Sequence, residues 1–126
     1  MGRRRAGAAL SLPEEILAGI RHFNARRYFE AHEAWEDHWG KGGPDERGAT
    51  LGLIKAAVAL HHLEARNAAG FAWQAGEAVK HLRANAHIWP PLELGALAET
   101  LESLVAQVRF HGRTPEPFEP PTLREE

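Results

Sequence analysis

Apolar residues recur with helical spacing in five stretches of the chain, which are separated by glycine, proline and short polar turns. The first predicted helix begins at Ser11, a residue type that caps helix N-termini, and runs to about Asn24. Asn24 suits a helix end because its short amide tolerates the turn and can bond to it. The second predicted helix spans Tyr28 to Trp39 and stops at Gly40, where a glycine- and proline-rich loop begins.

The other three predicted helices differ in how much apolar surface they carry. The third, from Glu46 to about Ala69 and closed by Gly70, is apolar around most of its circumference, whereas the outer helices carry a single stripe. Two further helices are expected at residues 71–88 and 92–110, on either side of Pro90 and Pro91. We therefore predict an all-α fold, a compact bundle of about five helices with a central apolar third helix. The sequence has no long strand-like alternation and no internal repeat at a fixed period.

The two ends of the chain differ in composition from this helical part. Residues 1–10 contain an arginine run and are expected to form a disordered basic tail. Residues 112–126 contain four prolines, with Phe118 and Leu123 as the apolar residues available for packing, and predict an extended tail. The expected organisation is thus a single helical-bundle domain at residues 11–111 between two tails.

Composition narrows the classes of function. The net charge of −2 gives no broad positive field, so nucleic acid is not an expected partner. The most apolar stretch, Gly48 to Leu60, contains Lys55 and is too short for a membrane span, which makes a cytoplasmic location the expectation and excludes a membrane partner. The absence of cysteine removes thiol chemistry and the soft ligands of structural zinc sites.

The second predicted helix places polar residues on an apolar face. At about 100° per residue, one arc contains Tyr28, Phe29, His32, Trp35, Glu36 and Trp39. Glu33 lies at the edge of this arc, and Glu30, Asp37 and His38 lie outside it, where solvated groups are expected. A glutamate among tryptophan rings is costly without a partner, so we expect Glu36 to pair with His32.

The third predicted helix carries a similar feature. His61 falls on its apolar circumference, with Glu64 one turn onward, whereas His62 points elsewhere. Facing helices of a bundle are common places for a pocket or metal site. The predicted ligand pocket therefore consists of Tyr28, Phe29, His32, Trp35, Glu36, Trp39 and His61.

Several roles fit this cluster. It could be a buried structural pair or a small-ligand pocket. Alternatively, His32, Glu36 and His61 could bind a divalent metal ion in a hydrolase-like enzyme, with Glu33 as the catalytic base. The string from His32 to Glu36 resembles the zinc-protease helix motif with glutamate in place of its second histidine. In a third interpretation, the protein is a helical interaction module, either a homo-oligomer or a binder of another protein through leftover apolar surface or the proline-rich tail.

The same residues also form a recognisable pattern. Asn24, Tyr28, Phe29, Glu30, His32, Glu33, Glu36 and Trp39, followed by Gly52-Leu53-Ile54 and Leu60-His61-His62, resemble the family catalogued as domain of unknown function 309. The resemblance covers residues 24 to about 82. It implies a small all-α bundle of prokaryotic proteins, with the His-Glu helix as its hallmark and no established activity. Neither tail is included in the resemblance.

Overall fold

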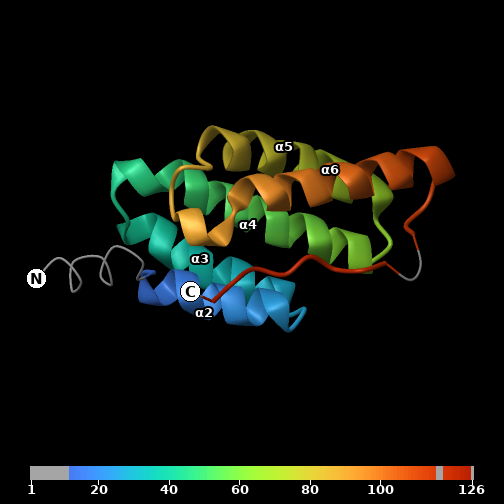
Figure 1. The fold of residues 1–126 in the computed structure, drawn as a ribbon. Helices are drawn as coiled ribbons and strands as arrows, with labels where there is room; N and C mark the ends of the chain where they lie inside the picture. The colour runs from blue at the N-terminus through green and yellow to red at the C-terminus, as the bar shows by residue number, and fades with distance from the viewer. Residues whose placement is uncertain (1–11, 116–117, 126) are drawn as a thin grey trace, which may run out of the picture.

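The computed structural model describes residues 12–115 and 118–125, which form a helical bundle (Figure 1). Within these residues there are five α-helices and one short 3₁₀ helix, and no strand. The elements in chain order are α2 (Glu14–Asn24), α3 (Tyr28–Lys41), α4 (Pro44–Glu64), α5 (Ala68–Ala84), η1 (Pro90–Leu92) and α6 (Leu94–His111). Each α-helix packs against the next one along the chain. The all-α bundle expected from the sequence is confirmed, whereas Ser11 and the basic tail lie outside the described residues.

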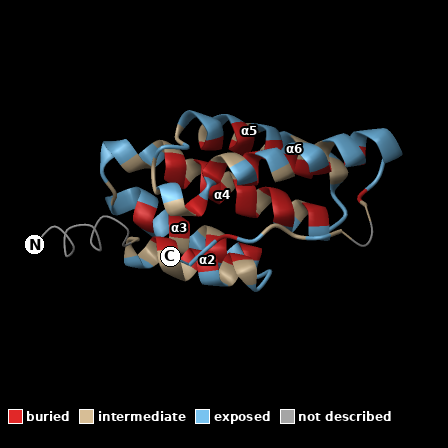
Figure 2. Ribbon diagram, in the orientation of Figure 1, coloured by how far each residue is buried: buried red, intermediate tan, exposed pale blue. Residues whose placement is uncertain are grey.

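Helix α4 occupies the centre of the bundle, as its apolar circumference predicts. It packs against α3 on one side and α5 on the other, and both of those helices also pack against outer helices. Figure 2 shows buried positions along α4 after its exposed first turn. Its buried residues are Ala49, Thr50, Gly52, Leu53, Ile54, Ala56, Ala57, Ala59, Leu60 and Leu63. No helix among the described residues is long and apolar enough to cross a membrane.

The turn between α2 and α3 and the turn between α4 and α5 have the same backbone conformation. Their sequences are also similar. His22-Phe23-Asn24-Ala25-Arg26-Arg27 in the first turn corresponds to His62-Leu63-Glu64-Ala65-Arg66-Asn67 in the second. Arg26 and Arg66 both adopt a positive φ, of 64° and 61°. In each turn the N–H of the following residue donates to the carbonyl of the preceding histidine at 2.8 Å. The chain thus repeats a helical hairpin, although its sequence predicted no internal repeat at a fixed period.

Several predicted helix boundaries are wrong for a local reason. Helix α4 ends at Glu64 rather than near Ala69, because the turn with the positive-φ residue follows immediately. Gly70 does not close a helix; its N–H donates to the Asn67 side chain at 2.9 Å in the first turn of α5. Gly40 lies inside α3, which continues to Lys41. Gly40 and Gly70 therefore do not mark helix ends; the Asn67 side chain and the adjoining turns set these boundaries.

Candidate functional site

The large buried side chains of α3 fix its position against α2. Tyr28 and Trp35 are buried as predicted, and both rings contact Phe23. The Trp35 indole lies directly over Gly19, where an added Cβ would come within 2.1 Å of Nε1. From this position Nε1 donates a hydrogen bond of 3.1 Å to the carbonyl of Ile16. Burial raises the pKa of Tyr28 to about 12, with a further contribution from the nearby Glu64 charge.

The rest of the predicted aromatic face lies at the surface. Phe29 is 55% exposed and Trp39 is 40% exposed, and Glu36 is exposed as well. His32 is half-buried, and its Nε2 lies 3.2 Å from Glu36 Oε2. The pairing of the two residues is therefore present, but its predicted burial is wrong. The buried stripe of α3 is Tyr28, Ala31, Trp35 and His38, which is rotated from the predicted arc because the small Ala31 faces the core in place of His32.

His61 does not face the interior either. It is exposed, and its ring lies 6.2 Å from the ring of His62. Glu64 forms an ion pair of 2.8 Å with Arg26 across the two matching turns. Among the residues that the structure describes, no group of three or more histidine, aspartate or glutamate side chains is placed to hold a metal ion. This geometry gives no support to a metal site at His32, Glu36 and His61, and the role of Glu33 as a base stays a prediction.

The structure reveals a polar cluster at His38, a residue that the sequence pattern placed in solvent. His38 is only 8% exposed, and its ring lies beside that of Trp89. Its Nδ1 is 3.3 Å from Glu15 in the first turn of α2, and its Nε2 is 2.7 Å from Glu46 in the first turn of α4. Each ring nitrogen of His38 therefore faces a carboxylate oxygen from a different helix. The signal for its burial was its spacing from Tyr28, Ala31 and Trp35.

Glu15 extends this cluster to the end of α3. Its carboxylate also accepts a hydrogen bond from Lys41. The hydrogen bond from Lys41, followed by those from the backbone and His38, lowers the pKa of Glu15 from 4.5 to about 2. The cluster joins the ends of α2, α3 and α4, so its evident role is to hold three helices in register.

The C-terminal segment binds across the bundle by its main chain. Asn24 Nδ2 donates to the carbonyl of Leu123 at 2.7 Å, and the N–H of Leu123 donates to Asn24 Oδ1 at 2.8 Å. Leu123 is 6% exposed and belongs to the core. Asn24 is the last residue of α2, as predicted. Its side-chain amide, however, forms hydrogen bonds with the distant segment at Leu123 rather than with the local turn.

The described C-terminal residues 118–125 run back over the bundle between α2 and α6 (Figure 1). We refer to these residues as the tail. The Arg26 guanidinium lies over the ring of Phe118, 5.5 Å from its centroid. The two residues after Leu123 form exposed ion pairs. Arg124 lies 3.7 Å from Glu93 on the side of α6, and Glu125 lies 3.4 Å from Arg21 of α2. We define the tail-binding surface as the residues beneath and beside the tail: Arg21, Asn24, Arg26, Leu92, Glu93, Ala96, Leu97 and Thr100.

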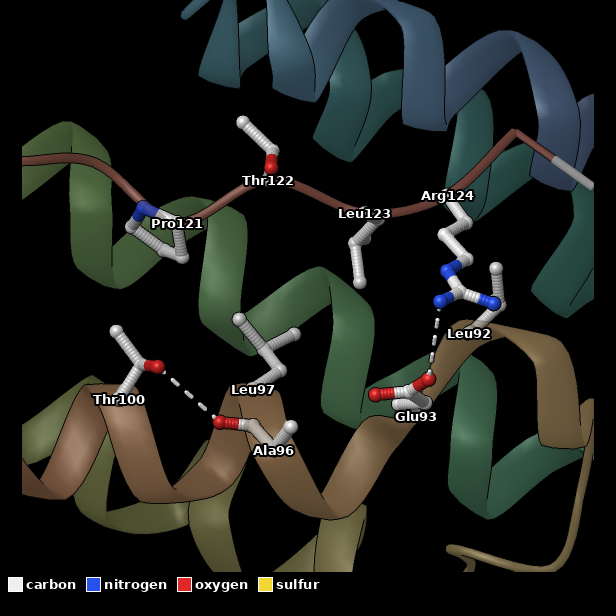
Figure 3. A pocket seen from close by; sticks show the side chains of 9 residues that line it. All are labelled: Leu92, Glu93, Ala96, Leu97, Thr100, Pro121, Thr122, Leu123 and Arg124. Carbon is white, nitrogen blue, oxygen red and sulfur yellow. Dashed lines mark hydrogen bonds and ion pairs between the residues drawn. The ribbon is translucent and has the colours of Figure 1, made fainter.

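The tail does not fill this surface. A hollow of about 320 Å³ remains where Pro121 to Arg124 face η1 and the first turns of α6 (Figure 3). A second hollow, of about 550 Å³, lies between Phe118 and Glu119 and the middle of α6. Thr100 borders both hollows. The contact between the tail and α6 is therefore loose, in contrast to the paired hydrogen bonds on the side of α2.

Comparison with known proteins places the hairpin helices in a family. The model of the family described as "Domain of unknown function (DUF309)" matches residues 16–73. This part of the chain belongs to that family. The uncharacterised protein YpuF of Bacillus subtilis (strain 168) is 32% identical over 100 residues, which cover 76% of this chain and 58% of that protein. The chain thus spans a little over half of this relative. No solved structure matches the chain significantly.

Only some of the residues that contact the tail lie in the segment matched by the family model. Asn24 and Arg26 lie inside the matched segment, whereas α6 and the tail lie beyond it. Asn24, whose side chain binds the main chain of the tail, therefore belongs to the DUF309 segment. The tail itself does not.

Proposed function

We propose that the protein is a helical interaction module that binds an extended segment of a partner protein on its tail-binding surface. The observation that carries this proposal is the pair of hydrogen bonds between the Asn24 amide and the main chain of Leu123. Nearly every residue offers the same N–H and C=O groups, so this contact selects an extended backbone and does not depend on the side chain. A partner segment that brings a leucine to the same place can make the same contacts.

The contacts of the tail are few enough for a partner to replace it. Burial of Leu123 contributes about 1.5–3 kcal/mol, and a hydrogen bond to Asn24 contributes about 0.5–1.5 kcal/mol. The ion pairs at Glu93 and Arg21 join exposed groups and add little. The conformational entropy lost when the tail is ordered offsets much of this gain. Local release of the tail should therefore require much less free energy than unfolding of the bundle.

The other roles considered for the chain have less support. A metal-dependent enzyme or a pocket built on the His32 cluster needs several polar groups that converge inside the protein. Glu36 and His61 are exposed instead, and Phe29 and Trp39 do not form an enclosing wall. The His38 cluster satisfies its groups internally and links helix ends.

A peptide-binding measurement tests the proposal on the full-length chain. A fluorescently labelled synthetic peptide of residues 113–126 is titrated into wild-type protein and into the variant Leu123→Ala, and anisotropy is recorded. In the wild type the attached tail competes at an effective concentration in the millimolar range, so binding in trans should be weak. Loss of the Leu123 side chain weakens the attached tail, so we expect the variant to bind the peptide at least about tenfold more tightly, a change of roughly 1.4 kcal/mol.

The double variant Asn24→Ala/Leu123→Ala is the matched control, because it frees the surface and removes the group that binds the peptide main chain. We expect it to lose most of the peptide affinity of the single variant, with an unchanged far-UV circular dichroism spectrum. Absence of peptide binding to folded Leu123→Ala protein at millimolar peptide, or equal binding by both variants, would overturn the proposal.

A further inference from the structure

The unfilled hollow beside the tail indicates which partner segment this surface fits. We infer that the partner carries a bulky apolar side chain two residues before its leucine and a basic residue directly after it. The inference rests on the proposed function and adds the chemistry of the partner. The tail of the chain has Pro121, Leu123 and Arg124 at these three positions. In this interpretation it binds the surface weakly in the absence of the partner.

The shape of the hollow supports the first position. Its wall on the side of the bundle consists of Leu92, Glu93, Ala96, Leu97 and Thr100, and two of these residues, Leu92 and Leu97, belong to the buried core. Its volume of about 320 Å³ leaves room for a large side chain. Leu92 and Leu97 are themselves almost fully buried, so a bulky apolar side chain that enters the hollow would gain free energy mainly by removing its own surface from water and by dispersion contacts with the wall.

The direction of the side chains along the tail decides which position can fill it. Figure 3 shows the side chains of Pro121 and Leu123 on the side of α6, whereas the Thr122 side chain points away from α6, although Thr122 also borders the hollow. Leu123 is already buried, and the short ring of Pro121 leaves the hollow empty. A longer side chain at the position of Pro121 would therefore enter the hollow.

The charge beside the hollow supports the basic position. Glu93 lies at the start of α6 with a positive φ of 53°, and its carboxylate faces Arg124 at 3.7 Å. Both side chains are more than half exposed, so the pair contributes little affinity. A fixed negative charge at this point instead favours one direction and register of the bound segment.

Peptides that differ at a single position test the inference. Full-length Leu123→Ala protein is titrated with labelled peptides of residues 113–126 that have the natural sequence, Pro121→Phe or Thr122→Phe. The two variant peptides carry the same added phenylalanine, but it faces α6 only in Pro121→Phe. We expect about tenfold tighter binding of the Pro121→Phe peptide than of the natural one, and little change for Thr122→Phe. The loss of a proline that favours extended backbone reduces the gain.

The outcomes separate the two proposals. If the natural peptide binds but Pro121→Phe binds no better, or Thr122→Phe gains as much, the inference about the hollow is wrong and the interaction surface stands. If none of the three peptides binds, both proposals fail. The full-length variants Pro121→Phe and Thr122→Phe give a second measurement without added peptide. The former should melt a few degrees above the latter if the attached tail fills the hollow, and equal melting temperatures would contradict the inference.

Discussion

At the scale of single residues, the position of His38 shows what a helical pattern leaves open. Helical spacing alone predicted a solvated side chain, but His38 lies between carboxylates from two other helices and beside Trp89. Tyr28 and Trp35 are buried as expected, but Phe29 and Trp39 from the same predicted face are 55% and 40% exposed, so an aromatic side chain alone does not decide which face is buried. Which of Ala31 and His32 faces the core depends on how α3 docks, and this is decided by neighbouring helices.

The Glu15 carboxylate should make the stability of the fold depend on pH. Its folded-state pKa of about 2 lies below the ordinary value of 4.5, so its contribution is complete above about pH 4.5 and disappears as the pH falls toward about 2. We expect Glu15→Gln to have a lower melting temperature than the wild type at pH 7, with the difference vanishing by about pH 2. Thermal melts from pH 7 to pH 2 measure this, and the neighbouring Glu14→Gln controls for loss of a charge in the same turn. A constant difference across this range would contradict the assignment.

At the scale of helices, the contact between α2 and α3 depends on a glycine that sequence patterns do not explain. Gly19 lies inside α2, where glycine costs about 0.5–1 kcal/mol relative to alanine. The reason for its presence is the Trp35 indole, which occupies the space that a Cβ would take. In a single sequence, a glycine that admits a neighbouring ring is indistinguishable from one that marks a weak helix. The predicted stops at Gly40 and Gly70 also failed, because a glycine in a helix does not by itself mark the end of that helix.

Alanine substitutions at two helical glycines should have opposite effects. In Gly19→Ala the Trp35 ring must move and its hydrogen bond to Ile16 is strained, so we expect a loss of about 2 kcal/mol or more despite the better helix propensity. Gly76 in α5 has no atom within 4 Å of an added Cβ, and Gly76→Ala should stabilise the protein by about 0.5–1 kcal/mol. Urea denaturation compares the two variants. A stabilised Gly19→Ala protein would show that α2 and α3 pack differently.

At the scale of the whole molecule, the sequence predicted the all-α architecture but could not predict where residues 118–125 pack. Five amphipathic segments with one apolar helix among them specify a layered bundle, because each stripe needs a neighbour. The contact between Asn24 and Leu123 joins residues 99 positions apart, and no local spacing encodes such a pair. Leu123 stood out in the sequence only as an apolar residue among prolines.

Removal of the Asn24 amide should therefore release the tail without unfolding the bundle. Asn24→Ala removes both hydrogen bonds to Leu123 and leaves its main chain without a partner there, so we expect a loss of about 1–3 kcal/mol of stability. Hydrogen exchange followed by mass spectrometry should show much faster exchange in a peptide that contains Leu123, with little change in α4. Asn67→Ala, which removes the side-chain cap of α5 at the corresponding end of the second hairpin, should cost about 1 kcal/mol but leave exchange in the tail unchanged. Equal acceleration in α4 and the tail of Asn24→Ala would mean that the two unfold together, and the tail would then be a fixed part of the core rather than a replaceable ligand.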